Sequence, residues 1–328
     1  MRRVRDLMRS KTVRRIAQTA TGPLIVSGLA LLALDVARRV FRHTQLFCPL
    51  EEPAISWDPA AYGLPPERVE EHWMETDDGE LLYGWYCRAE KPMASALFCH
   101  GNTGNLTTIA TVIPHLLDSG INVLLFDYRG FGRSTGRPSL SGVVADGVTA
   151  ARYHDTIRPQ DQSSILYGYS LGGAIAAQVT KQHAFDGLIL QSTFTNLREL
   201  ARVAFPRVPL HLVSGNFFDT LAVVRKLDIP VLILHGTEDE TIPCWMAHRL
   251  FDACVAPKEI RIVEGGLHKD LYVRDGDQLV WAVNRFAADL PHRPHRRPPK
   301  PPLFDQLIDA AFRRMRRHLR ARTAHGTL

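Results

Sequence analysis

Cysteine is scarce in this chain, and its few cysteines form no framework. The five cysteines are scattered and odd in number, and no C-x-x-C pair occurs: Cys48, Cys87, Cys99, Cys244 and Cys254. This pattern excludes a disulfide scaffold and a cysteine-based zinc site. Cys99 lies in an apolar run, and we expect it to be a small core residue. We expect no metal and no cofactor.

Acidic residues are nearly absent from the two ends of the chain. Residues 1–15 contain seven basic and one acidic side chain, and residues 291–328 contain ten basic and two acidic ones. Because the whole chain has a net charge of +6, the part between the ends has a net charge of about −8. Basic ends can contact anionic lipid or nucleic acid. No aromatic pattern or nucleic-acid-binding module accompanies the arginines, so we do not expect nucleic acid as a partner.

Stretches of nineteen or more residues without Asp, Glu, Lys or Arg are few, and the first of them lies between Arg15 and Asp35. As a helix, residues 16–34 would span about 28 Å, close to the thickness of a hydrocarbon core. We predict an uncleaved, single-pass membrane anchor. A signal peptide and a helix of the soluble domain remain alternatives, although no small-x-small cleavage site precedes Arg38-Arg39. More basic residues precede the stretch than follow it, which favours a cytoplasmic N-terminus with the following domain across the membrane.

A glycine-flanked serine lies in the middle of the chain. The motif is Gly168-Tyr169-Ser170-Leu171-Gly172, and it separates an apolar run from a run of small residues. Strand, G-x-S-x-G and helix in this order are typical of a nucleophile elbow, a tight turn in which the glycines avoid steric collisions. Ser170 is therefore the candidate nucleophile.

A serine nucleophile needs a base, and the base needs an orienting acid. Asp239 follows the apolar run 230–235, where an acid is expected downstream of an elbow. Glu238 and Glu240 are rivals by proximity. His268 follows the alternating run 259–264. A single loop histidine is more often a surface residue, but the order Ser, Asp, His favours a catalytic triad.

The oxyanion of such a reaction needs two backbone N–H donors. Leu171 N–H, directly after the serine, is one candidate. The loop after the predicted strand 95–99 should supply the other, and Asn102 N–H is our choice. His100 in this loop is interpreted as a structural brace rather than as a base.

Together these motifs resemble the α/β-hydrolase superfamily from about Glu71 to Leu290. Within it the chain is similar to the serine aminopeptidase-like branch, especially membrane-anchored members with little lid. The motifs are His100-Gly101-Asn102, residues 127–134, the Ser170 elbow, residues 235–239 and His268. Lys269 is a departure, because relatives often have Asn or Asp directly after the histidine. The resemblance implies a serine hydrolase with the triad Ser170, Asp239 and His268.

The pattern of apolar runs predicts the same class of fold. Buried strands are expected near 95–99, 122–128, 164–169, 187–192, 230–235 and 259–264, with helical segments between them. This alternation predicts an α/β fold with a mostly parallel sheet and helices on both faces. A hairpin is expected around residues 77–79. Ligand sites in such sheets lie at the carboxyl ends of the strands, where Ser170, Asp239 and His268 all fall.

Two further regions allow alternative interpretations. Arg129 and Arg133 can form structural ion pairs, which we favour, or contact an acidic substrate. The insert 193–229 is too short for a large cap, so we expect a short or minimal one. Its aromatic and apolar residues can wall an acyl pocket or belong to the core: Phe194, Phe205, Leu210, Phe217 and Phe218.

The chain divides into four predicted parts. Residues 1–45 form the basic N-terminus and anchor, 46–290 the catalytic domain, 291–302 a stiff Pro/Arg-rich linker, and 303–328 a basic amphipathic helix and tail. The helix can lie on a membrane surface or dock on the domain, and its sequence favours neither.

The sequence supports three hypotheses. The first is a serine hydrolase of carboxylic esters, thioesters or amides, acting on a small acyl or lipid-like substrate through an acyl-enzyme. The second is an acyltransferase that uses the same triad. The third is an inert, membrane-tethered scaffold, against which the intact triad argues.

Overall fold

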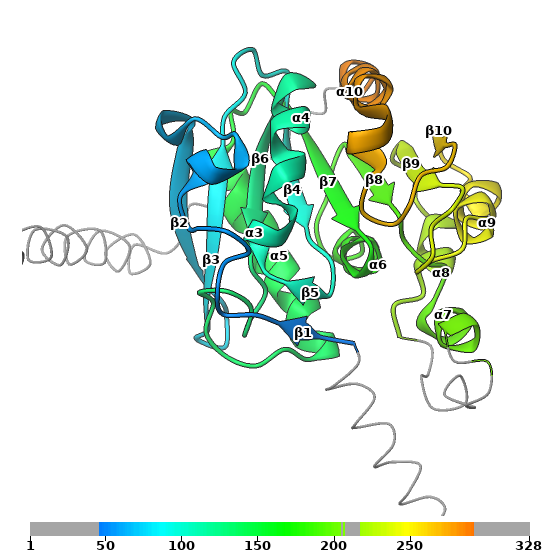
Figure 1. Ribbon diagram of the computed structural model, residues 1–328, viewed down its shortest axis with the longest axis horizontal. Helices are drawn as coiled ribbons and strands as arrows, with labels where there is room; N and C mark the ends of the chain where they lie inside the picture. Colours follow the sequence, from blue (N-terminus) through cyan, green and yellow to red (C-terminus); the bar gives the residue numbers. More distant parts are fainter. Residues whose placement is uncertain (1–45, 205, 207–216, 292–328) are drawn as a thin grey trace, which may run out of the picture.

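A sheet of eight strands forms the centre of the molecule, in the order β10-β9-β8-β7-β4-β6-β3-β2 (Figure 1). The computed structural model describes residues 46–204, 206 and 217–291. The strands are β2 (Val69–Glu75), β3 (Leu81–Cys87), β4 (Ala94–Cys99), β6 (Ile121–Phe126), β7 (Ser163–Tyr169), β8 (Gly187–Gln191), β9 (Val231–Gly236) and β10 (Lys258–Val263). Only β2–β3 and β3–β6 pair in antiparallel fashion. The predicted α/β class with a mostly parallel sheet is confirmed.

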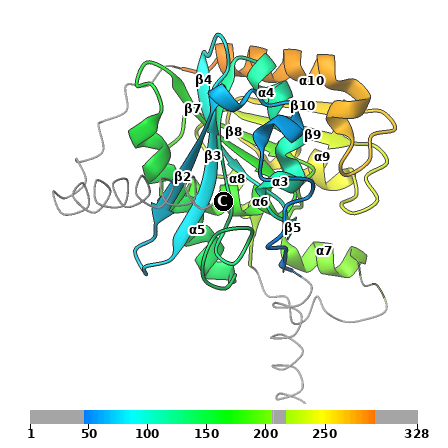
Figure 2. The same cartoon turned by 60° about the vertical axis from the view of Figure 1, so that its left-hand side comes forward.

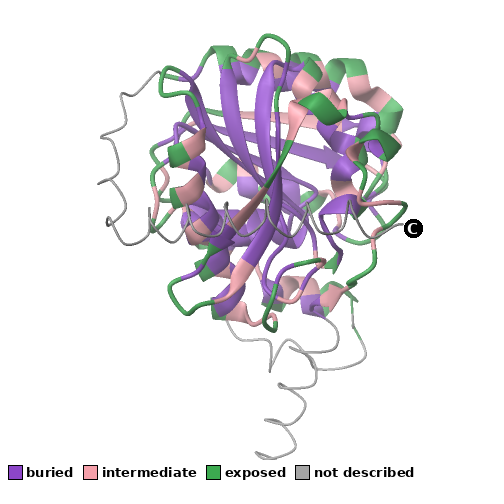
Figure 3. Ribbon diagram, turned by 90° about the vertical axis from the view of Figure 1, so that its left-hand side faces the viewer, coloured by how far each residue is buried: buried purple, intermediate pink, exposed green. Residues whose placement is uncertain are grey.

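The inner strands are apolar throughout because both faces of the sheet are covered. Every residue of β4, β6, β7, β8 and β9 is buried. The edge strand β2 instead keeps exposed glutamates along its length. Figure 3 shows this contrast as a buried centre with exposed residues at the rim. Continuous apolar runs are typical of parallel strands that lie between two layers of helices.

Two layers of helices enclose the sheet, each with its own apolar core. One face carries α3 (Leu106–Ile109), α4 (Ile113–Asp118) and α10 (Leu271–Ala288) (Figure 2). The other carries α5 (Leu140–Ile157), α6 (Leu171–Val179), α8 (Thr220–Val224) and α9 (Trp245–Ala253). The insert after β8 contributes α7 (Leu197–Ala204) and α8. Its described parts are therefore two short helices, as expected for a minimal cap.

The predicted anchor, the Pro/Arg-rich linker and the basic C-terminal helix lie outside the described residues. Within residues 46–204, 206 and 217–291, no helix has both the length and the apolarity needed to cross a bilayer. The predictions for the two ends of the chain stay predictions.

Residues 46–54, which we call the N-terminal strap, run beside the loop that follows β4. Within the strap, β1 (Cys48–Pro49) pairs in parallel with β5 (Thr103–Gly104) (Figure 1). Phe47 is buried and packs edge-on against Phe131. The strap is therefore fixed to that loop, a contact that our sequence analysis did not predict.

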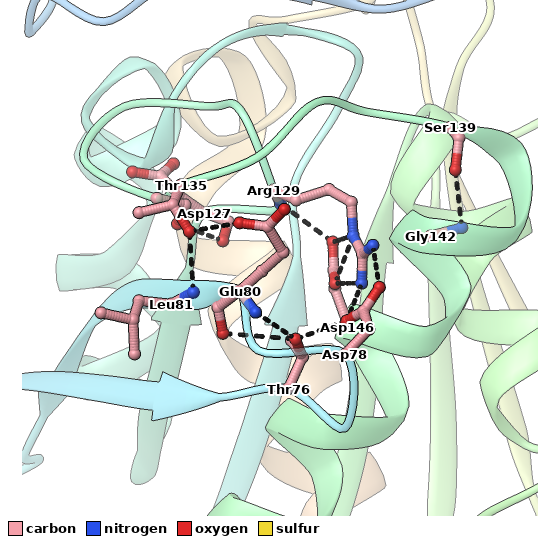
Figure 4. Close-up of polar contacts among 11 residues, drawn as sticks. Thr76, Asp78, Glu80, Leu81, Asp127, Arg129, Thr135, Ser139, Gly142 and Asp146 are labelled. Carbon is pink, nitrogen blue, oxygen red and sulfur yellow. Dashed lines mark hydrogen bonds and ion pairs between the residues drawn. The ribbon is translucent and has the colours of Figure 1, made fainter.

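Arg129 joins three parts of the domain (Figure 4). Its Nε lies 2.9 Å from Oδ1 of Asp146 in α5, and its backbone N–H donates to Oδ2 of the same carboxylate. Its Nη1 lies 2.6 Å from Oδ2 of Asp78 in the β2–β3 turn. The hydrogen bond from Arg129 lowers the pKa of Asp78 to about 2. The structural ion pair that we favoured for Arg129 is thus present.

Arg133, the second arginine of this region, lies at the surface. Its guanidinium is 3.8 Å from the Glu71 carboxylate and 4.4 Å from the centre of the Trp57 ring. Both contacts are within the domain, which agrees with the structural role that we favoured.

We predict that Arg129→Met lowers the free energy of unfolding by about 3–5 kcal/mol, because it leaves the Asp146 carboxylate buried without its cation. Urea unfolding followed by circular dichroism measures this loss. Arg152→Met is the matched control, since its pair with Asp77 is exposed. We expect it to cost about 1 kcal/mol or less. Equal losses in the two variants would contradict the role given to Arg129.

Candidate functional site

Ser170 lies at the sharp junction between β7 and α6. Its backbone has φ 55° and ψ −121°, a conformation that a residue with a side chain rarely adopts. Two contacts from the end of β8 hold it: Ser170 N–H donates to Gln191 O at 2.9 Å, and Thr193 Oγ1–H donates to Ser170 O at 2.7 Å. The turn therefore has the strained strand-to-helix geometry that the sequence motif predicted.

The two glycines of the motif are required because neighbouring backbone atoms leave no room for a side chain at either position. A Cβ on Gly172 would lie 2.0 Å from the carbonyl oxygen of Cys99, and one on Gly168 would lie 2.4 Å from Cα of Gly173. Both obstacles are backbone atoms that cannot move aside without shifting β4 or α6. The elbow can thus pack against β4 only with glycine at these positions.

The structure brings Ser170, His268 and Asp239 together. His268 Nε2 lies 3.0 Å from Ser170 Oγ, and His268 Nδ1 lies 2.8 Å from Asp239 Oδ2. All three residues are buried. Because a carboxylate only accepts hydrogen bonds, Nδ1 carries the proton and Nε2 is free to accept one from the serine hydroxyl. The arrangement can move a proton from Ser170 to His268.

Asp239 is held as an anion by its surroundings. Burial opposes its ionisation, but hydrogen bonds from His235 and His268 outweigh this effect and hold the pKa of Asp239 well below its usual range. The backbone N–H groups of Thr241 and Ile242 also donate to Oδ1, at 2.9 and 2.7 Å. The carboxylate is therefore ionised and fixed in position near neutral pH.

His235, at the end of β9, is a contributor that our sequence analysis missed. Its Nε2 lies 2.8 Å from Ile242 O and 3.2 Å from Asp239 Oδ2. A carbonyl can only accept, so Nε2 carries the proton and points toward the carboxylate as well. The contact could not be inferred from the sequence pattern, since His235 reads as the polar end of an apolar strand.

The two rival acids lie apart from the histidine ring nitrogens. Glu240 Oε2 accepts from the backbone N–H of His268 at 3.2 Å. Glu238 is exposed, and its backbone N–H donates to Gly266 O at 3.0 Å. Of the three neighbouring carboxylates, Asp239 is thus the one that contacts the imidazole.

Of the two predicted oxyanion donors, Leu171 directly follows the serine, and Asn102 follows a glycine that lies close to it. Leu171 opens α6, and a Cβ on Gly101, which precedes Asn102, would lie 3.5 Å from Cβ of Ser170. Within the described residues, neither Asn102 N–H nor Leu171 N–H has a hydrogen-bond acceptor. Two unpaired N–H groups beside a serine are what an oxyanion hole needs.

His100 is a brace for this loop. It is buried, its Nδ1 lies 2.8 Å from Gly101 O, and its ring packs against Tyr128. Burial lowers the pKa of His100 to about 4, so the ring is neutral near pH 7. Its contact with the loop backbone agrees with the structural interpretation that we made from the sequence.

The aromatic residues of the insert divide between core and surface. Phe194 and Phe218 are buried in the apolar core, whereas Phe217 is partly exposed. Phe205 and Leu210 lie outside the described residues. Phe194 and Phe218 therefore contribute to the core, and Phe218 also lines a pocket together with Phe217 and Phe47.

Comparisons with known proteins identify the family. A family model described as serine aminopeptidase, S33, matches residues 90–224. An uncharacterized protein of Mycobacterium tuberculosis H37Rv is 32% identical over 86% of this chain and 98% of its own length. Protein bem46 of Schizosaccharomyces pombe is 31% identical over 66% of this chain and 76% of its own length.

Solved structures show the same fold. An esterase of Pyrococcus furiosus superposes with a TM-score of 0.60 at 17% identity, over 75% of this chain and 98% of that esterase. An esterase domain from Rhodothermus marinus superposes with a TM-score of 0.51 at 22% identity, over 67% and 96%. The fold, the family model and the extent of these sequence matches show that the chain belongs to the α/β-hydrolase superfamily, among the hydrolases that resemble serine aminopeptidases.

Proposed function

We propose that the protein is a serine hydrolase that cleaves carboxylic esters, and by the same chemistry thioesters or amides, through an acyl-enzyme. Ser170 Oγ attacks the acyl carbonyl while His268 Nε2 takes its proton. His268 then gives this proton to the leaving group, and Asp239 stabilises the imidazolium. A water molecule attacks the acyl-enzyme next, which releases the acid and frees the serine.

The main support for this proposal is that the His268 imidazole contacts both Ser170 and Asp239. A general base must be within hydrogen-bond distance of the proton that it removes, and the 3.0 Å between His268 Nε2 and Ser170 Oγ meets this condition. The 2.8 Å contact to Asp239 supports the tautomer that the reaction needs. The unpaired N–H groups of Asn102 and Leu171 are the proposed donors to the oxyanion.

Esters rank above peptides as substrates in this proposal. The described insert is two short helices rather than a large cap, which suits acyl chains of varied length. The names of the structural relatives from Pyrococcus furiosus and Rhodothermus marinus also say esterase. The proposed substrate is a small acyl or lipid-like ester.

We predict that Ser170→Ala lowers kcat for p-nitrophenyl esters by at least about 10⁴-fold, because the acyl-enzyme can no longer form. Initial rates across acyl chain lengths measure this loss and identify the preferred chain. Unchanged activity in the variant would exclude Ser170 as the nucleophile. No activity in the wild type, together with no labelling of Ser170 by a fluorophosphonate, would favour the inert scaffold.

A second prediction separates the carboxylates of the acid loop. Asp239→Asn should lower kcat by about 10³–10⁴-fold, since an amide can hold the imidazole in the wrong tautomer. Glu240→Gln, the matched control, should stay within about tenfold, because an amide oxygen still accepts from His268 N–H. The same esterase assay compares the two variants, and the reverse order of losses would make Glu240 the acid.

We also propose that residues 16–34 anchor the protein to a membrane, with the predicted basic C-terminal helix as a second lipid contact for which docking on the domain is the equal alternative. The support is the uncharged stretch itself and the basic charge at both ends of the chain. The excess of basic residues before the stretch favours an extracytoplasmic catalytic domain.

We predict that Leu24→Arg with Val26→Arg moves the full-length protein from the membrane pellet to the supernatant at alkaline pH. Each charge at the centre of a spanning helix costs about 2.5–3.5 kcal/mol. Leu307→Arg with Phe312→Arg is the control at the other end of the chain, and it should leave the protein in the pellet. If only the Leu307→Arg, Phe312→Arg variant is released from the pellet, the C-terminal segment rather than residues 16–34 attaches the protein to the membrane.

A further inference from the structure

The loop that carries the proposed oxyanion donor Asn102 is held from two sides. On the inner side, His100 Nδ1 donates to Gly101 O at 2.8 Å. On the outer side, the strap provides Cys48 N–H, which donates to Asn102 O at 2.8 Å, and Leu50 N–H, which donates to Gly104 O at 3.0 Å. Two successive peptide planes of the loop are thus fixed by their carbonyl oxygens.

This fixation sets the direction of the N–H group of Asn102. In a trans peptide, the carbonyl and the N–H point in opposite directions. The Gly101 carbonyl is turned toward His100, so the Asn102 N–H of the same peptide points away from that ring. The strap holds the following peptide through Asn102 O and so prevents the loop from rotating about Asn102.

Asn105 fastens the strap to the loop. Its Nδ2 donates to Leu50 O at 3.0 Å and to Glu52 O at 2.7 Å. Its Oδ1 accepts from Thr107 N–H at 3.0 Å and from Thr107 Oγ1–H at 2.5 Å. The side chain is buried, and all the hydrogen-bonding capacity of its amide is used.

A second connection runs through Thr107. Its Oγ1 accepts from Ala54 N–H at 2.8 Å while it donates to Asn105. Leu50 O, one of the carbonyls bound by Asn105, also accepts from Gly132 N–H at 3.0 Å. The strap is therefore bonded along its length to the oxyanion loop, to the start of α3 and to the loop after β6.

We propose that the strap holds the oxyanion loop in its active conformation, and that Asn105 is the positioning residue that links the strap to the loop. This inference rests on the proposed serine-hydrolase function. Asn105 does not touch substrate in this scheme. It keeps the loop in the one conformation in which Asn102 N–H faces the oxyanion, so its loss weakens the transition state more than the ground state.

The test compares the same substitution at two buried asparagines, Asn105 and Asn122, each of which forms hydrogen bonds between two segments of the chain. Asn105→Asp keeps the acceptor but replaces the two N–H donors with an oxygen that faces two carbonyls. Asn122, near the start of the inner strand β6, accepts from Ala89 N–H at 2.9 Å and donates to Gln162 Oε1 at 3.1 Å. Asn122→Asp is thus a control for the general cost of disturbing a buried amide.

We expect Asn105→Asp in the full-length protein to lower kcat for a short p-nitrophenyl ester by about 10²-fold with little change in KM. The affinity for a trifluoromethyl ketone, which forms an oxyanion on Ser170, should fall in parallel with kcat/KM. Asn122→Asp should lower the melting temperature to a similar extent and leave both quantities within about twofold of the wild type.

The outcomes are distinct. Wild-type kinetics and inhibitor affinity in Asn105→Asp would overturn the inference, and so would an equal loss in Asn122→Asp. If Asn105→Asp fails to fold, Thr107→Val provides the test instead. Valine has the same shape as threonine but lacks the hydroxyl, so the hydrogen bonds of Oγ1 with Ala54 and Asn105 are lost. A loss of kcat there supports the inference, and wild-type kcat overturns it. An inert wild type would instead refute the proposed function itself.

Discussion

The backbone of Ser170 is the constraint on which the site depends. A residue with a side chain at φ 55° and ψ −121° costs about 1–3 kcal/mol and persists only where its surroundings leave no alternative. Here β4 passes so close to the start of α6 that only glycine fits at position 172, and the end of β8 holds both backbone groups of the serine. The parallel sheet supplies these neighbours, because adjacent parallel strands all end at the same edge. The sheet thus both creates the strain and keeps the serine at the N-terminus of α6.

The negative charge of Asp239 lies at the same edge of the sheet, the one formed by the carboxyl ends of the strands, and it is stabilised by hydrogen bonds. Asp239 is buried, which alone would favour its neutral form, yet it receives hydrogen bonds from the rings of His235 and His268 and from two backbone N–H groups. These donors come from the end of β9, from the loop after β10 and from the turn that carries Asp239 itself. The anion is stable only where these three segments meet, so the chemistry of the carboxylate depends on the register of β9 against β10.

The features that the sequence predicted are those encoded within short segments. The inner strands were predicted because buried parallel strands are apolar along their whole length, and β10 because its residues alternate. The three candidate residues were predicted because each lies just past the carboxyl end of a strand. The partners of Arg129, the contact of His235 with Asp239 and the connection of Asn105 to the strap were not predicted. Asn105 and Leu50 lie far apart in the chain, and both residue types are common in loops, so no local pattern marks the pair. The catalytic role of the three residues stays a proposal that their geometry supports.

The strap gives the site a connection to the part of the chain that precedes the domain. Only residues 35–45 separate it from the predicted anchor, and even fully extended they span at most about 40 Å. If residues 16–34 lie in a membrane, the start of the strap is held within that distance of the bilayer surface. A hydrolase tethered in this way meets esters in the bilayer at a much higher local concentration than esters in solution. The strap, which follows the predicted anchor in the chain, is joined to the loop by backbone hydrogen bonds, so the part of the domain that comes first after the anchor is the part that holds the proposed oxyanion donor.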